Sequence, residues 1–266
     1  MDYTISSKDN KLIKHIRSLH QRKYRDRDEQ FFVEGIKLTI EALKQEENIT
    51  NIIVCPDIIQ SVNGGKEFIE DLNKYEVTVN TVTENIFKDI SDTETPQGVL
   101  TIIKKKKVLV ENIIFDEKKI YILLDGVQDP GNLGTIIRTA DAIAADGIFL
   151  SKGCADAYSP KTLRSSMGSI FRVPVIEKTE LSHIIYKMKD KGIKIIATSL
   201  QANQYHYNLN YDTGIGLVVG SESNGICEEV LKSADYIVKI PMRGGAESLN
   251  ASVAAGILMY EVIRDR

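Results

Sequence analysis

The sequence predicts an α/β protein of two domains, and two observations lead to that prediction. Along most of the chain, short apolar segments alternate with segments whose apolar residues recur at helical spacing. In the C-terminal half, the short apolar segments lack the polar alternation of a half-buried strand, which indicates a parallel sheet covered by helices on both faces. The 266 residues, 42% hydrophobic and 27% charged, suffice for one large or two modest domains.

Residues 1–107 predict a small α/β domain that begins with a basic helix, in which Leu12, Ile16 and Leu19 share one face. Strands are expected at 31–35, 52–55, 77–79 and 99–103, and helices at 36–43 and 66–72. Between Lys8 and Arg27 there are eight Lys or Arg and two Asp. A solvated helix face is the simpler interpretation, but such a local excess in a protein of net charge -3 favours phosphate contact. The candidate side chains are Lys14, Arg17, Arg22, Lys23 and Arg25.

Residues 104–119 are lysine-rich and polar, which we interpret as the domain junction, and the second domain is expected over 117–266. Its predicted strands are 121–124, 147–150, 193–197, 215–219 and 236–240. Its predicted helices are 135–144, 159–170, 181–191, 227–233 and 250–262. Parallel sheets of this kind bind ligands at the carboxyl ends of their strands, so the loops there are the candidate site.

Composition limits the other classes of function. The three cysteines are isolated and lack CxxC spacing, which favours a reducing cytoplasm over a disulfide framework or a zinc site. The four histidines are dispersed, so no metal site is predicted. The chain begins without an apolar export segment and contains no run of membrane-spanning length, so we expect a cytoplasmic protein with no membrane partner.

Two of the predicted loops carry polar side chains at the ends of buried strands. Residues 125–134 open a helix that carries Arg138, and residues 220–225 form a loop with glycine at both ends. Asn132 as a helix cap and the glycine loop as a plain turn are the simpler interpretations. The second loop matches neither the dinucleotide fingerprint nor a P-loop. Glu222 in this loop needs a partner, for which Arg138 is the candidate, and Gly220 would let a ligand approach the backbone.

A third loop, residues 240–250, leads from a strand into a helix of small and apolar residues. It places Ser248 and Asn250 where the helix begins, and one of them could be a simple N-cap. A cap alone requires neither the two glycines nor the Met-Arg pair that precede it. The crowding of polar groups at this point therefore favours a site.

In register, the three loops resemble the motifs of the SpoU/TrmH family of RNA ribose methyltransferases, within the SPOUT superfamily. The residues that match are 129–134 with 138–140, then Gly220, Glu222 and Gly225, and finally 240–242, 248–250 and 254–255. The N-terminal part resembles the family's substrate-binding domain, related to ribosomal protein L30e, through 31–35, 41–43 and 95–100. Ala144 stands where relatives often have glycine.

The resemblance implies a SPOUT-type parallel sheet with a C-terminal trefoil knot that binds S-adenosylmethionine largely through backbone groups. The implied cofactor-binding residues are Gly220, Ile240, Leu249, Thr198 and Met242. Arg138 would be the central catalytic residue, with Asn132, Glu222, Ser248 and Asn250 positioning it or the substrate. Because a guanidinium stays protonated well above pH 7, we expect Arg138 to clamp a phosphate and stabilise the developing alkoxide rather than act as a base.

The expected reaction is methyl transfer to a ribose 2′-hydroxyl of RNA, with ribosomal RNA preferred over transfer RNA as substrate and no metal required. Methylation of transfer RNA, a resistance enzyme acting on ribosomal RNA, and a catalytically idle RNA-binding or ribosome-assembly factor stay open. A SPOUT base methyltransferase is disfavoured by the pairing of Asn132 with Arg138. By resemblance, the chain should form a homodimer through its C-terminal helix and the first helix of the catalytic domain, with each active site beside the partner.

Overall fold

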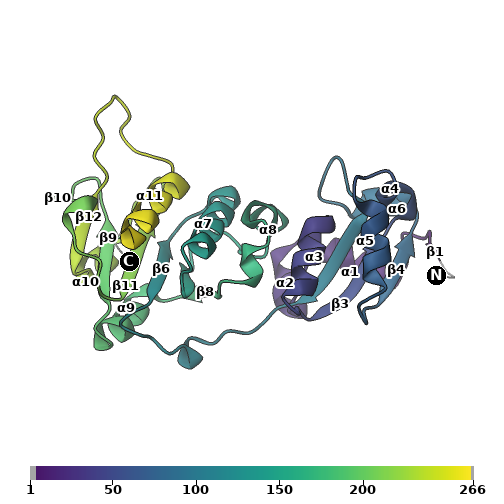
Figure 1. Ribbon diagram of the computed structural model, residues 1–266, viewed down its shortest axis with the longest axis horizontal. Coiled ribbons are helices and arrows are strands. Elements are labelled where there is room, and N and C mark those ends of the chain that lie inside the picture. Colours follow the sequence, from purple (N-terminus) through teal and green to yellow (C-terminus); the bar gives the residue numbers. More distant parts are fainter. Residues whose placement is uncertain (1–3, 265–266) are drawn as a thin grey trace. The chain divides into compact units, whose positions relative to one another are not determined.

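The computed structural model describes residues 4–264, and its contacts divide the chain into two compact units (Figure 1). Unit 1 comprises Met1–Lys107 and Tyr158–Arg164, and unit 2 comprises Val108–Ala157 and Ser165–Arg266. Both units mix helices and strands, which confirms the predicted α/β class. The short segment Tyr158–Arg164 belongs to unit 1 although the chain on both sides of it belongs to unit 2, an exchange that the sequence did not indicate.

Unit 1 is built on a five-stranded mixed sheet in the order β1-β4-β3-β5-β2. Strand β5 runs antiparallel to β2 and β3, whereas β1, β3 and β4 run parallel. Ile53 packs in the cluster of α1 and α6, and its neighbours Ile52 and Val54 pack in the cluster of α3 and α5, so helices cover both faces. The bounds are β1 (Thr4–Ile5), β2 (Gln30–Glu34), β3 (Ile49–Val54), β4 (Val79–Val82), β5 (Val99–Lys104), α1 (Lys11–Leu19), α2 (Arg22–Asp28), α3 (Ile36–Lys44), α4 (Pro56–Ile59), α5 (Gly65–Leu72) and α6 (Glu84–Ile90).

The basic helix expected at the N-terminus is two helices, α1 and α2, and a buried arginine accounts for the break. The Arg25 guanidinium donates hydrogen bonds to the carbonyl oxygens of Leu19 (2.6 Å) and His20 (2.8 Å). These carbonyls lie at the end of α1, where the helix itself supplies no partners. No glycine or proline marks the break in the sequence, because the capping group comes from the following helix.

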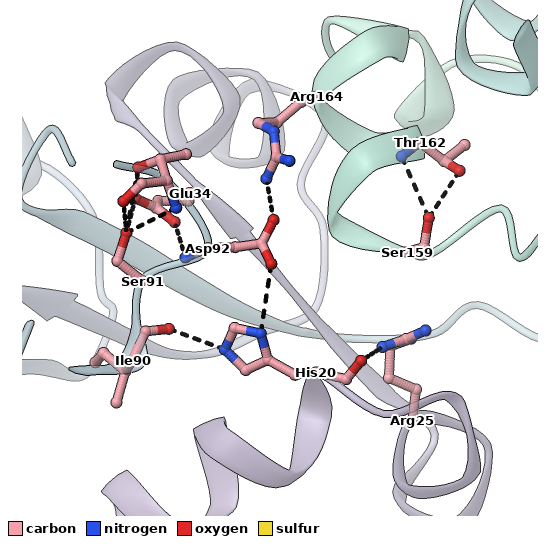
Figure 2. Close-up of polar contacts among 10 residues, drawn as sticks. His20, Arg25, Glu34, Ile90, Ser91, Asp92, Ser159, Thr162 and Arg164 are labelled. Atoms are coloured by element: carbon pink, nitrogen blue, oxygen red, sulfur yellow. Dashed lines mark hydrogen bonds and ion pairs between the residues drawn. The ribbon is translucent and has the colours of Figure 1, made fainter. Parts of the chain in front are cut away.

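Ion pairs and aromatic contacts hold the segment Tyr158–Arg164 within unit 1. The carboxylate of Asp92 lies between the Arg164 guanidinium and Nδ1 of His20, which is 3.6 Å away (Figure 2). The ring of Tyr158 lies 4.8 Å from that of Phe31, centroid to centroid. The segment is therefore fixed by both polar and apolar contacts.

Unit 2 is a seven-stranded, wholly parallel sheet in the order β10-β12-β9-β11-β6-β7-β8, as the apolar strands predicted. Its strands are β6 (Ile120–Asp125), β7 (Gly147–Ser151), β8 (Val175–Thr179), β9 (Lys194–Thr198), β10 (Gln204–Tyr205), β11 (Ile215–Gly220) and β12 (Tyr236–Lys239). The five predicted strands are all present, and the two that were not predicted, β8 and β10, are the edges of the sheet. An edge strand has one neighbour instead of two, so its apolar pattern is weaker.

Helices cover both faces of the unit 2 sheet. Residues of α9 share a core cluster with Leu123 and Val218, while α11 lies over β11 and beside α7 on the other face (Figure 1). The bounds are α7 (Pro130–Ala142), α9 (Leu181–Asp190), α10 (Glu228–Ser233) and α11 (Ala251–Ile263). Helix α8 (Pro160–Ser166) lies mostly in the segment Tyr158–Arg164 of unit 1. Short 3-10 helices occupy Val110–Asn112, Ser169–Phe171 and His206–Asn208. Within residues 4–264, no helix combines the length and apolar character needed to span a membrane.

Helices α7 and α8 differ from their predicted bounds for local reasons. Helix α7 begins at Pro130 rather than 135, because the Asp129 carboxylate caps it by accepting from the Asn132 backbone N–H at 2.8 Å. The helix expected over 159–170 ends at Ser166, since the following residues Met167 and Gly168 have φ of 52° and 91°. Ala144 just after α7 also has positive φ, 54°, which explains why glycine suits this position and costs alanine about 1–2 kcal/mol.

Candidate active site

A pocket of about 400 Å³ lies at the carboxyl ends of β9, β11 and β12, within the size range of small-molecule sites. Parallel pairing brings these ends together, because β9 lies between β12 and β11 in the sheet. The walls are largely apolar and include Leu200, Ile226 and Leu258, with polar groups of residues 220–225 on one side. All five residues predicted to bind the cofactor line this pocket, namely Thr198, Gly220, Ile240, Met242 and Leu249.

A hydrogen-bond network joins the three loops beside this pocket. The Asn132 side-chain amide donates from Nδ2 to the carboxylate of Glu222, which lines the pocket. Asn132 Oδ1 in turn accepts from Asn250 Nδ2 at 3.0 Å. Asn250 Oδ1 accepts from the backbone N–H of Ser252 at 2.9 Å, so Asn250 is also the N-cap of α11. The Asn250 side chain therefore caps α11 and also joins the hydrogen-bond network beside the pocket.

The network fixes the orientation of two amide groups. A carboxylate can only accept, so Glu222 requires the NH₂ group of Asn132 and leaves the Asn132 carbonyl oxygen for Asn250. The predicted ion pair between Glu222 and Arg138 is wrong, since the partner of Glu222 is Asn132. A neutral amide on the first turn of α7 satisfies the carboxylate and keeps both groups in place.

Arg138 and Ser248 are not part of this network. Arg138 lies on α7, is exposed, and makes no hydrogen bond or ion pair with any residue in the described range 4–264. It is not among the residues that line the pocket. Ser248 does line the pocket, from the exposed loop between β12 and α11 that stands out from the unit in Figure 1. The structure thus brings Asn132, Glu222 and Asn250 together and leaves the Arg138 guanidinium free to meet another molecule.

Gly220 is required by its own loop. A Cβ at this position would lie 2.2 Å from the carbonyl carbon of Gly225 and 2.5 Å from the backbone nitrogen of Ile226. The loop closes there through paired backbone hydrogen bonds between Ser221 and Gly225, at 3.0 and 3.2 Å. Close backbone packing therefore accounts for the glycine before any ligand is considered.

The basic residues predicted to contact phosphate differ in their freedom. Lys14 and Lys23 are exposed, with Lys14 paired to Asp9 at 2.8 Å. The Arg17 guanidinium contacts Asp89 with two nitrogens, and Arg22 lies 3.8 Å from Asp26. Arg25 is 4% exposed and bonded to backbone carbonyls, so its assignment to phosphate contact is corrected to a structural role.

Two further kinds of group bear on this site, the cysteine thiols and the possible metal ligands. Burial raises the pKa of the thiols of Cys55, Cys154 and Cys227, the opposite of what a thiolate nucleophile needs. Among residues 4–264, no group of three or more His, Cys, Asp or Glu is placed to hold a metal ion.

Several pocket residues were not predicted from the sequence. Leu200, Ile226 and Leu258 have the composition of an ordinary core, so only the fold shows that they face a pocket. Tyr205 and Tyr207 do not line this pocket but lie nearby in sequence, in β10 and in the 3-10 helix that follows it, a segment that the strand prediction missed. The available signal in the sequence was a pair of tyrosines two residues apart in a polar segment, which is the spacing of a short strand.

The chain was compared with known families and proteins. Residues 119–260 match the SpoU rRNA Methylase family, and residues 10–101 match the MRM3-like substrate binding domain. The "23S rRNA (guanosine(2553)-2'-O)-methyltransferase RlmP" of Bacillus subtilis (strain 168) is 34% identical over 258 residues, covering 97% of this chain and 98% of that protein. The putative TrmH family tRNA/rRNA methyltransferase YacO of the same organism is 32% identical, covering 88% and 96%. The AdoMet-bound rRNA methyltransferase from Sinorhizobium meliloti has a similar structure, with a TM-score of 0.86, 32% identity, and coverage of 98% and 97%.

The network predicts that Asn132 and Glu222 are energetically coupled. Asn132→Asp should place two carboxylates against each other and lower the free energy of unfolding, and Glu222→Gln should lose the charge-assisted bond. The double variant should recover stability, because the introduced glutamine amide can donate to the introduced aspartate carboxylate. A double-mutant cycle by urea unfolding should give a coupling of about 0.5–1.5 kcal/mol. Asn224→Asp, with the same added charge in the same loop, is the control, and strictly additive effects would contradict the coupling.

Proposed function

The chain belongs to the SpoU rRNA Methylase family, and we propose that it methylates a ribose 2′-hydroxyl of ribosomal RNA. It is an S-adenosylmethionine-dependent RNA methyltransferase of the SPOUT type. The observation that carries the proposal is the pocket of unit 2, which is lined by the five residues predicted to bind the cofactor and lies beside the Asn132, Glu222 and Asn250 network. A ribosomal rather than transfer RNA target is supported by the 97% coverage of this chain by a 23S rRNA methyltransferase. An RNA target also supports a cytoplasmic location.

The pocket residues suit an adenosyl group that carries a positive charge. Leu200, Ile240 and Leu249 offer apolar walls, and the Glu222 carboxylate lies at the same pocket. When bound, S-adenosylmethionine supplies an electrophilic methyl group. We propose that backbone groups at Gly220, Ile240 and Leu249, with Thr198 and Met242, hold it, in loops that form the family's trefoil knot.

The chain's own groups must orient the ribose hydroxyl, which is a poor nucleophile, and stabilise the alkoxide that forms as its proton leaves. We propose that the amide of Asn132, held by Glu222, and the hydroxyl of Ser248, which lines the pocket, position the sugar. Arg138 stays a cation at neutral pH, so we assign it to clamping the adjacent phosphate and stabilising the alkoxide. Its exposure and lack of a partner among the described residues support a role toward a bound molecule.

We further propose a homodimer through α7 and α11. Val253, Ile257 and Tyr260 lie at successive turns of α11 and are 50%, 38% and 55% exposed, an apolar stripe on a helix whose other faces are packed. Arg138 lies on α7, the helix beside α11, and outside the pocket of its own chain. A dimer across these helices would bring Arg138 of one chain to the pocket of the other.

Arg138→Ala should lower methyl transfer at least about 100-fold, the typical loss for removing one transition-state contact, and leave cofactor affinity within about twofold. Arg138→Lys should retain partial activity if only the positive charge matters. It should retain little activity if the two parallel hydrogen bonds of a guanidinium are needed. Ribose-methylation mapping of RNA from cells that carry Arg138→Ala should show one methyl missing from ribosomal RNA. A methyl missing from transfer RNA instead would show that transfer RNA is the substrate. An active Arg138→Ala enzyme would show that Arg138 is not a catalytic residue.

Changing both Lys14 and Lys23 to Gln should weaken RNA binding and reduce the slope of log affinity against log salt by about two, one for each phosphate contact. Cofactor affinity should stay unchanged, because both lysines belong to unit 1. Arg25→Gln is the matched comparison in the same helix pair. It should lower the free energy of unfolding by about 1–3 kcal/mol and leave the salt slope of the folded protein unchanged. An unaltered salt slope for the lysine variant would indicate that α1 and α2 are an ordinary solvated surface that does not contact RNA phosphate.

Ile257→Arg should dissociate the dimer, because it places a charge in the centre of the exposed stripe while leaving the core of α11 intact. Light scattering should give about twice the chain mass of 29.8 kDa for the wild type and a single chain mass for the variant. Methyl transfer should fall with dissociation, although no catalytic group changes. Tyr186→Arg, at a 73% exposed position on α9, is the control and should stay dimeric. A monomeric wild type at assay concentration would contradict the dimer.

A further inference from the structure

An exposed aromatic stack stands at the edge of the unit 2 sheet, outside the cofactor pocket. The rings of Tyr205 and Tyr207 are nearly parallel, with centroids 5.3 Å apart and an interplanar angle of 18°. The Lys239 ammonium lies 5.5 Å from the centroid of the Tyr205 ring. Tyr207 is 42% exposed and ends the stack on the solvent side.

The backbone around the stack is held by several contacts, so the rings are positioned in advance. Strand β10 pairs with β12 and sets Tyr205 directly beside Lys239. His206 lies between the two tyrosines in the sequence and is buried. Its Nδ1 is 3.3 Å from the Lys239 carbonyl oxygen. The Tyr211 hydroxyl donates to the His206 carbonyl oxygen at 2.6 Å. A stack fixed in this way loses little entropy when a flat ligand joins it.

The stack borders a second pocket of about 390 Å³ that also contains two cations. Tyr205, Tyr207, Lys239 and Arg243 line it, together with Ile240 and Met242, and Glu247 is the one acidic side chain among the lining residues, so the cations are in excess. Ile240, Met242 and Lys239 also line the cofactor pocket, so the two pockets share a wall. An aromatic face with two adjacent cations is the combination that binds a base and its phosphate in single-stranded nucleic acid.

We propose that this second pocket binds one unpaired nucleotide of the substrate RNA, with its base stacked on Tyr207 and its phosphate against Lys239 and Arg243. This inference rests on the proposed RNA-directed function and adds a substrate subsite to it. Stacking reads no particular base, because every base has an aromatic face, so the subsite would position a flanking nucleotide rather than select the sequence. The shared wall places that nucleotide next to the one whose ribose is methylated.

The chain has no tryptophan, so Tyr207→Trp introduces a single fluorescent ring at the proposed stacking position. A short single-stranded oligoribonucleotide should quench this fluorescence at saturation, and an abasic strand of the same length should quench it far less. Tyr186→Trp, exposed on α9, is the control and should respond equally little to both strands. Equal quenching of the Tyr207→Trp variant by the two strands would overturn the stacked base.

Two further experiments test whether the ring that stacks at position 207 belongs to RNA or to the cofactor, and whether the two cations contact a phosphate. S-adenosylhomocysteine alone should leave the fluorescence of the Tyr207→Trp variant unchanged, and quenching by it would assign the stack to the cofactor's adenine instead. Lys239→Gln with Arg243→Gln should lower the salt slope of RNA binding by about one, because the two cations contact a single phosphate, and an unchanged slope would overturn the phosphate contact.

Affinity and activity measurements complete the test. Tyr207→Ala should weaken RNA binding about 5- to 150-fold, the effect of losing one base stack, whereas Tyr207→Phe should retain affinity. Equal affinity of Tyr207→Ala and the wild type would overturn the subsite. Methyl transfer by the wild type separates the two proposals: transfer without quenching of the Tyr207→Trp variant rejects the subsite alone, and no transfer to RNA at all rejects the proposed function.

Discussion

The parallel pairing of β6 with β11 is the constraint on which the site depends. Their register places Leu124 opposite Val219 and Asp125 opposite Gly220, so the loops that follow the two strands leave the sheet side by side. The Asp125 carboxylate accepts from the Cys227 backbone N–H at 2.8 Å and ties the end of β6 to the loop after β11. Only with these loops adjacent can Asn132 reach Glu222, and only then does Asn250 meet Asn132.

Backbone shape then sets what the loops can bind. The closed turn from Ser221 to Gly225 leaves no room for a side chain at position 220. The pocket wall at this position is therefore bare backbone. The third loop is exposed almost throughout, yet it ends in the Asn250 cap that starts α11. One wall of the pocket is thus rigid by packing and the other is anchored at its end, which lets a ligand enter a preformed site.

The sequence predicted the architecture well where burial dictates pattern and poorly where contacts from elsewhere decide. The five inner strands of unit 2 are apolar on both faces and could be read directly, whereas β8 and β10 lie at the edges. The separation of α1 from α2 depends on Arg25, whose role follows from its burial and not from its charge. Spacing placed Asn132, Glu222 and Asn250 at loop ends, but their partners follow from strand order, which no local pattern encodes.

Helix α7 illustrates how one element can serve two binding sites. Asn132 and Arg138 are six residues apart, and at about 100° per residue they point roughly 120° away from each other around the helix. The face with Asn132 is committed to the pocket of its own chain through Glu222. The Arg138 side chain therefore leaves the helix in a different direction, and its exposure makes it accessible to a molecule that packs against α7. The neighbouring α11 exposes an apolar stripe on the outside of the same layer, so the proposed second copy of the chain would use both features at once.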